Sequence, residues 1–207
     1  MSWWESAYAG SPPWDVGGPQ PEIVELVEHN EIPKGKVLDV GCGLGDNAIF
    51  LAKSGFAVAC LDIAHLAIEK SKARANGQKI KVDFRVGNVL RLDEYFDKEC
   101  FDAVIDSGLF HTLDDPERSL FAKQIKRILV AHGKYFMLCF SDQEPEGFGP
   151  RRISKKEIRE TFARAFKIDY IKEASFASKH DMKAKAYMTS MTKANAKSKQ
   201  ENNLVHH

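Results

Sequence analysis

A short apolar run that ends in a glycine-rich turn constrains the fold of this chain more than any other feature. Residues 37–45 are Val-Leu-Asp-Val-Gly-Cys-Gly-Leu-Gly. The first four predict a short buried strand, and the glycines let the backbone turn sharply and approach a ligand closely. A helix is predicted next, at residues 48–53, ending before Gly55. This strand–turn–helix unit is typical of an α/β domain.

The rest of the chain alternates between strand and helix patterns. Asp115 is expected to cap one helix with Pro116 at its first position, and Ser154 forms a capping box with Glu157 ahead of another. The predicted strands are short apolar runs at residues 37–40, 57–61, 80–86, 101–105, 135–140, 168–171 and 184–191. Because the last two strands have no helix between them, we predict a Rossmann-like, doubly wound α/β fold: a mostly parallel seven-stranded sheet with an antiparallel edge hairpin and helices on both faces.

The chain of 207 residues is long enough for one such domain. Residues 1–20 are rich in Trp, Pro and Gly and are expected to form an irregular N-terminal arm, while residues 21–192 form the domain itself. Residues 193–207 are polar and unpatterned, which predicts a disordered tail. We treat its terminal His206 and His207 as tag remnants.

Charge and cysteine content narrow the function classes. A net charge of +1 gives no electrostatic reason to expect nucleic acid or a membrane as a partner. Four scattered cysteines without a C-x-x-C pair predict no metal site and a reducing, cytoplasmic environment. Lysines gathered late in the chain are expected to be solvated rather than to bind nucleic acid: Lys179, Lys183, Lys185, Lys193, Lys197 and Lys199.

The glycine turn differs from a dinucleotide-binding fingerprint in two ways. Asp46 stands where that fingerprint has its third glycine, which argues against a nicotinamide-dependent oxidoreductase. Asp39 lies two positions before the first glycine, where its charge would repel a pyrophosphate and attract a cationic amino-acid group. Asp62 ends the second predicted strand, where a carboxylate can accept hydrogen bonds from two ribose hydroxyls or cap the following helix.

With these residues in place, the segment resembles motif I of the class I S-adenosylmethionine-dependent methyltransferases. The resemblance implies S-adenosylmethionine as cofactor and S-adenosylhomocysteine as product, with no metal. Asn88 takes the place of the family's usual adenine-binding Asp; its carbonyl oxygen can still accept, although it can equally be a plain turn residue. The other residues that the resemblance implies at the cofactor are Trp14, Asp39, Gly41, Cys42, Gly43, Gly45, Asp62, Ile63, Val89 and Asp106.

The N-terminal arm narrows the resemblance to a subgroup. Residues 4–21, with Trp4-Glu5, Tyr8 and Pro12-Pro13-Trp14-Asp15, resemble thiol, halide and thiopurine methyltransferases and bacterial quinol and heterocyclic-phenol methyltransferases. Residues 110–118 and 149–154 continue the resemblance. A small-molecule acceptor is therefore implied, as a thiol, halide or phenol, in a monomer or homodimer. A tellurite-type metalloid methyltransferase and a catalytically silent cofactor-binding protein are the alternatives.

Roles at the acceptor end stay open at this point. Four large aromatic residues within positions 3–14 indicate that the arm covers something apolar, either as a lid or as a cap on the core. His111 follows the fourth strand and is the candidate general base, although it can equally be structural. The residues expected to contact the acceptor are Trp4, Tyr8, Phe110, Arg151 and Arg152.

Overall fold

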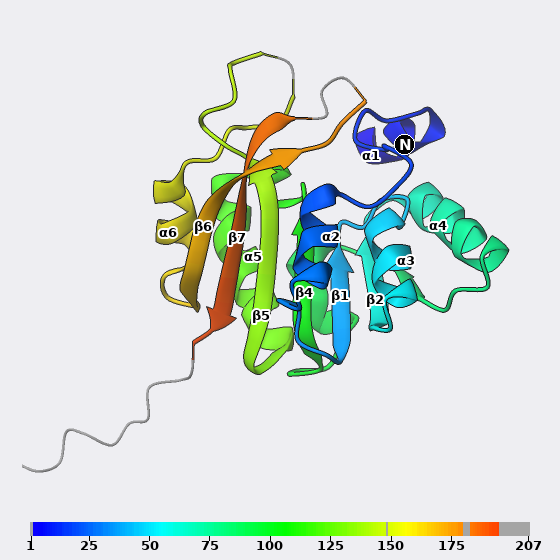
Figure 1. The fold of residues 1–207 in the computed structure, drawn as a ribbon, viewed down its shortest axis with the longest axis horizontal. Helices are drawn as coiled ribbons and strands as arrows, with labels where there is room; N and C mark the ends of the chain where they lie inside the picture. Colours follow the sequence, from blue (N-terminus) through cyan, green and yellow to red (C-terminus); the bar gives the residue numbers. More distant parts are fainter. Residues whose placement is uncertain (1, 148, 180–182, 195–207) are drawn as a thin grey trace, which may run out of the picture.

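The computed structural model describes residues 2–147, 149–179 and 183–194. Its centre is one seven-stranded sheet in the order β3-β2-β1-β4-β5-β7-β6 (Figure 1). Strands β1 to β5 pair in parallel, whereas β7 pairs antiparallel with both β5 and β6. The mostly parallel sheet with an antiparallel edge pair is thus confirmed. The strands are β1 (Lys36–Val40), β2 (Ala57–Asp62), β3 (Asp83–Val86), β4 (Phe101–Ser107), β5 (Leu129–Phe140), β6 (Phe166–Phe176) and β7 (Ala184–Lys193).

Helices cover both faces of the sheet, because the strands bury side chains in both directions. Leu38 and Val40 of β1 belong to one core cluster and Val37 to the other. Helices α5, α6 and η1 pack over the first cluster, and α2, α3 and α4 over the second. The helices are α1 (Trp3–Ala9), α2 (Pro21–Glu28), α3 (Asp46–Lys53), α4 (His65–Gly77), η1 (Val89–Glu94), η2 (Phe110–Thr112), α5 (Asp115–Ile128) and α6 (Lys155–Phe162).

Two local predictions need correction. The N-cap of α5 is Asp114, not Asp115, because the Asp114 carboxylate accepts the Glu117 N–H and Glu117 accepts the Asp114 N–H in return. The arm is not wholly irregular: α1 begins after Ser2, whose hydroxyl accepts the Glu5 N–H. The predicted capping box of α6 is present.

Several strand boundaries also differ. β3 is shorter than predicted, because residues 80–82 stay outside the ladder. β5 is longer because Leu129 pairs with Phe101 of β4 ahead of its apolar run, and β6 is longer because antiparallel pairing with β7 extends it. Of the predicted tail, Lys193 belongs to β7, and residues 195–207, with His206 and His207, lie outside the described residues.

The N-terminal arm is tied to both ends of the sheet. At one end, the Glu5 carboxylate accepts the His65 and Leu66 N–H groups at the start of α4. At the other end, the buried Gln20 amide donates to the Ala177 carbonyl and accepts the Ala177 N–H, both at 2.9 Å. In Figure 1 the arm accordingly lies above α4 and reaches toward the end of β6.

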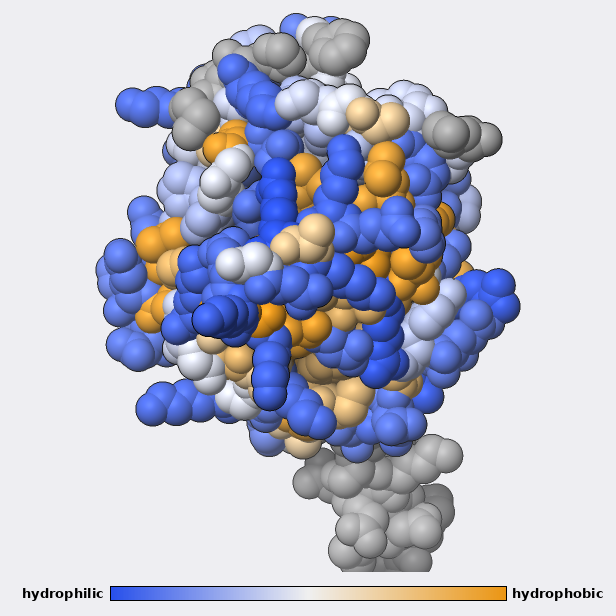
Figure 2. Space-filling view, turned by 90° about the vertical axis from the view of Figure 1, so that its right-hand side faces the viewer, coloured by the Kyte–Doolittle hydropathy of each residue, from blue (hydrophilic) through white to orange (hydrophobic). Residues whose placement is uncertain are grey.

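The surface on the α4 side is mostly hydrophilic, with apolar residues showing in patches between charged ones (Figure 2). Within the described residues, no helix is both long enough and apolar enough to cross a bilayer.

Candidate active site

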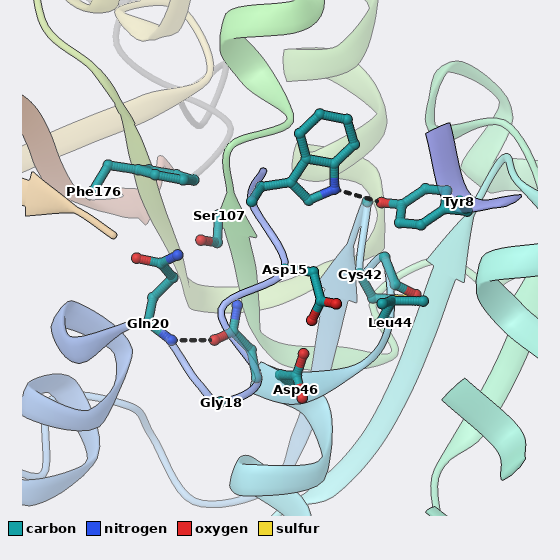
Figure 3. Close-up of a pocket in the computed structure, with 13 residues that line it drawn as sticks. Tyr8, Asp15, Gly18, Gln20, Cys42, Leu44, Asp46, Ser107 and Phe176 are labelled. Carbon is teal, nitrogen blue, oxygen red and sulfur yellow. Dashed lines mark hydrogen bonds between the residues drawn. The ribbon is translucent and has the colours of Figure 1, made fainter. Parts of the chain in front are cut away.

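A pocket opens at the carboxyl ends of the parallel strands, where β1 and β4 lie side by side and the strand order reverses (Figure 3). Open α/β sheets bind their ligands at such a point. Three parts of the chain line it: the arm over residues 8–20, the turn over residues 41–47, and the ends of two strands, at Ser107 of β4 and Phe176 of β6.

The turn after β1 depends on glycines with left-handed backbone angles. Gly41, Gly43 and Gly45 have φ angles of 65°, 53° and 78°, values that residues with a side chain rarely adopt. A Cβ atom on Gly43 would lie 2.7 Å from the Tyr8 hydroxyl of the arm. The bare turn therefore leaves backbone groups facing the pocket and lets the arm come down close to them.

Three aspartates are buried below this turn, at the ends of adjacent strands. Asp39, Asp62 and Asp106 are 1%, 5% and 0% exposed. Burial raises the pKa of each carboxyl group, that of Asp106 to about 7, and at Asp39 the charges of Asp106 and Asp62 raise it further. This end of the pocket is therefore suited to a cationic group, which would favour the ionised carboxylates.

Asp39 has an acceptor to spare. Its Oδ2 is buried and has no hydrogen-bond partner among the described residues. A buried acceptor without a partner carries a desolvation cost that a ligand donor would offset. With the glycine turn, this atom fits the amino-acid part of S-adenosylmethionine, whose ammonium group would supply both the hydrogen bond and the charge.

Asp62 holds the turn in place. One carboxylate oxygen accepts the Gly43 N–H at 2.8 Å and the other accepts the Ala64 N–H at 2.9 Å. Each oxygen has a second lone pair, so the ribose hydroxyls expected at this residue still find acceptors. The helix-capping and ribose roles considered from the sequence are thus compatible at this carboxylate.

The remaining cofactor candidates lie around this centre with different contacts. Asp106 accepts hydrogen bonds from the Leu109 N–H and from the Tyr135 hydroxyl, so it orders the chain after β4. The side chain of Asn88 accepts the Leu90 N–H at 2.9 Å and caps η1. Ile63 is half exposed and Val89 is buried.

Only part of the predicted acceptor set reaches the pocket. Tyr8 lines it together with Trp14, which was predicted at the cofactor, and the Trp14 Nε1–H donates to the Tyr8 hydroxyl at 3.1 Å. Trp4, a residue of α1, packs beside them against α4. Phe110, in contrast, is fully buried in the core, with its ring under the guanidinium of Arg118.

The predicted arginines are engaged elsewhere. Arg151 forms ion pairs with Asp115 and Glu157 on α5 and α6. The Arg152 guanidinium donates to the carbonyls of Pro145 and Pro150. Neither arginine lines the pocket.

His111 is buried and neutral. Its Nδ1 accepts the Phe140 N–H at 3.1 Å, which assigns the ring proton to Nε2. Burial, reinforced by the charges of Arg118 and Arg152, lowers the pKa of His111 to about 3. In this arrangement the ring offers a donor to its surroundings, and the lone pair that a general base would use is already occupied.

The structure adds pocket residues that sequence reasoning did not single out, namely Asp15, Gln20, Ser107 and Phe176. Asp15, Gln20 and Ser107 lie inside segments whose patterns were recognised, so proximity to those motifs was an available signal. The sequence carried no such signal for Phe176, because an apolar residue in a predicted strand region is indistinguishable from an ordinary core residue.

Comparison with known proteins agrees with this site. A methyltransferase-domain family model matches residues 37–133. A 2-heptyl-1-hydroxyquinolin-4(1H)-one methyltransferase of Mycobacteroides abscessus is 32% identical, over 86% of this chain and 82% of that protein. A probable thiol methyltransferase of Arabidopsis thaliana is 30% identical, over 74% of this chain and 68% of that one. A solved structure described as converting a disulfide bond into a thioacetal group during echinomycin biosynthesis has a TM-score of 0.83 and 28% identity, over 94% of this chain and 92% of that one.

The chain therefore belongs to the class I S-adenosylmethionine-dependent methyltransferases. Within that class it falls in the subgroup of small-molecule and thiol methyltransferases, as the arm had indicated. The family sets aside the nicotinamide-dependent alternative.

The Asp39 oxygen without a hydrogen-bond partner leads to a prediction about cofactor binding. Burial, together with the charges of Asp106 and Asp62, raises the pKa of Asp39, so affinity for the cationic S-adenosylmethionine should increase with pH as this carboxyl group ionises. Asp39→Asn should weaken binding by about 2 kcal/mol where the carboxylate is ionised and remove most of the pH dependence. Calorimetry measures both, with Asp102→Asn at the opposite end of β4 as the matched control. An Asp39→Asn protein that binds like the control would refute the assignment.

Proposed function

We propose that this enzyme methylates a small thiol, halide or phenol-type acceptor by in-line displacement, in the cytoplasm. The observation that carries the proposal is the pocket itself, which runs from the glycine turn to aromatic residues of the arm and of β6. The acceptors named for the relatives, a hydroxyquinolone and thiols, support the same classes.

When bound, the cofactor supplies an electrophilic methyl group on a sulfonium, and the bond from methyl to acceptor forms as the bond from methyl to sulfur breaks. The protein's contribution is to hold donor and acceptor in line and to exclude water. Tyr8 and Trp14 of the arm cover the glycine turn and help to exclude water. Asp39, whose Oδ2 has no partner among the described residues, would hold the ammonium group at the amino-acid end of the donor.

His111 was left open as a general base or a structural residue, and its occupied Nδ1 argues against the base and leaves Nε2–H as a donor. A halide or thiolate needs no base, and a thiol with a pKa near about 8.5 is partly ionised at neutral pH. A phenol, with a pKa near about 10, would react as its minor ionised form and lose its proton to water. Nε2–H of His111 can then orient an anionic acceptor without removing a proton.

The arm acts as a lid in this proposal. It joins the domain through an apolar cluster around Tyr8 and through polar contacts, including the Lys70 ammonium on the Tyr8 carbonyl and the Lys179 N–H on the Pro13 carbonyl. The polar contacts exchange readily with water, whereas the glycine turn and Asp62 lie in the domain proper. Loss of the arm should therefore affect transfer more than cofactor binding.

An acceptor panel tests the proposed function. Thiols, iodide, thiocyanate, phenols and an N-hydroxyquinolone are each offered with S-adenosylmethionine, and release of S-adenosylhomocysteine is measured. We expect release with at least one of these and none with tellurite. Release with tellurite alone would establish the metalloid alternative, and binding of cofactor without release for any acceptor would indicate a silent protein.

The role of His111 predicts a pH profile. Because its pKa is about 3, kcat/KM for a phenol should follow the ionisation of the phenol alone, without an inflection near about pH 6.5. His111→Gln should lower the rate and leave the shape of the profile unchanged. An inflection near that pH in the wild type that disappears in His111→Gln would show that His111 is a base after all.

The lid predicts a split between binding and turnover. Deleting residues 1–17 should leave a folded protein that binds S-adenosylhomocysteine within about tenfold of wild type, while methyl transfer falls about 100-fold or more. Trp14→Ala should reproduce part of this loss. Trp3→Ala, which changes an exposed residue of the same arm, is the control and should turn over acceptor nearly normally. A truncated protein with wild-type turnover would reduce the arm to a cap on the core.

A further inference from the structure

Phe176 has a position at the pocket that its sequence context did not suggest. It is the last residue of β6, and the antiparallel edge pair carries it to the same side of the sheet as the glycine turn. Its side chain is only 5% exposed, yet it lines the pocket. Figure 3 shows the ring directed toward Ser107 at the end of β4.

The Phe176 ring is held in one orientation by its neighbours. It packs edge-to-face on Phe140, with ring centroids 5.2 Å apart, and lies 5.8 Å from the His111 ring. On the side of β4 the chain makes room for it: Gly108 has a φ of 87°, and a Cβ there would lie 2.9 Å from the Phe176 ring. A ring fixed in this way presents a preformed apolar surface to the pocket, with little conformational entropy left to lose on binding.

Among the labelled polar residues of the pocket, Ser107 and Gln20 lie nearest to this surface, whereas Asp15 and Asp46 lie farther from it (Figure 3). The Ser107 hydroxyl makes no hydrogen bond with any other described residue. Gln20 lines the pocket as well, but its amide is committed to the Ala177 backbone. Trp14 contributes a second aromatic ring, from the arm. An aromatic wall with one available hydroxyl matches a flat ring that carries a single polar substituent.

We propose that Phe176 is a specificity-determining residue that stacks against the ring of a flat aromatic acceptor, a phenol or an N-hydroxylated heteroaromatic, while Ser107 hydrogen-bonds its polar substituent. This inference rests on the proposed function and selects among its acceptor classes. Iodide and thiocyanate present no ring face, so the Phe176 surface gives them no comparable binding.

The test compares two acceptors across three substitutions. Phe176→Leu keeps the residue apolar and removes the ring, Phe176→Tyr keeps the ring, and Phe96→Leu removes a buried ring near the far side of η1 as the control. For an N-hydroxyquinolone, Phe176→Leu should raise KM at least about tenfold, while Phe176→Tyr and Phe96→Leu stay within about threefold of wild type. For iodide or thiocyanate, all three should stay within about threefold. Equal effects of Phe176→Leu on both acceptor types, or none on the quinolone, would overturn the proposal.

A binding measurement separates this proposal from the proposed function. Calorimetry of the N-hydroxyquinolone on the protein saturated with S-adenosylhomocysteine requires no turnover. Weaker binding to Phe176→Leu, with unchanged affinity for S-adenosylhomocysteine, supports the aromatic surface even if wild-type protein methylates none of the panel. Equal binding to wild type and Phe176→Leu refutes it even if methylation is observed.

Discussion

Burying three carboxylates beside one another is the constraint on which the rest of this site depends. Asp39, Asp62 and Asp106 end three adjacent strands and are almost inaccessible to water. Each ionised carboxylate in such a place has a desolvation cost, and each raises the cost of the others. Backbone N–H groups offset part of this cost at Asp62 and Asp106. At Asp39, by contrast, one buried carboxylate oxygen has no hydrogen-bond partner among the described residues. This carboxylate therefore has an affinity for a cation.

The same carboxylates connect the cofactor site to the lid. Asp62 fixes Gly43, and a Cβ atom at Gly43 would lie only 2.7 Å from the Tyr8 hydroxyl of the arm. Glu5 of the arm meanwhile supplies the start of α4 with a carboxylate acceptor, because the capping residue Ala64 has no polar side chain. In this position the arm therefore completes the start of α4 and also covers the glycine turn.

Much of the fold could be predicted from the sequence, because its information is local. The apolar run over residues 37–40 with its glycines, and the Ser154–Glu157 capping box, are each defined within a few residues. The length of β6 and the pairing of Gln20 with Ala177, 157 residues away, are not. These depend on which strand lies next to which, and neighbouring sequence carries no signal for them. The same holds for Phe176, which only the edge pair brings to the pocket.

The two ends of the pocket differ in charge, and the difference suits the reaction. At the proposed donor end, Asp39 and Asp62 are buried beneath the glycine turn, and their carboxylates favour a cationic ligand. At the ends of β4 and β6, where we propose that the acceptor binds, Ser107 and the Phe176 ring line the pocket, and burial and the charge of Arg118 keep the neighbouring His111 neutral. In methyl transfer the positive charge on the donor disappears, and an anionic acceptor loses its charge at the same moment. A neutral apolar acceptor end does not solvate that anion strongly, so it leaves the anion's reactivity high. The charge that binds the donor is thus kept away from the group that attacks it.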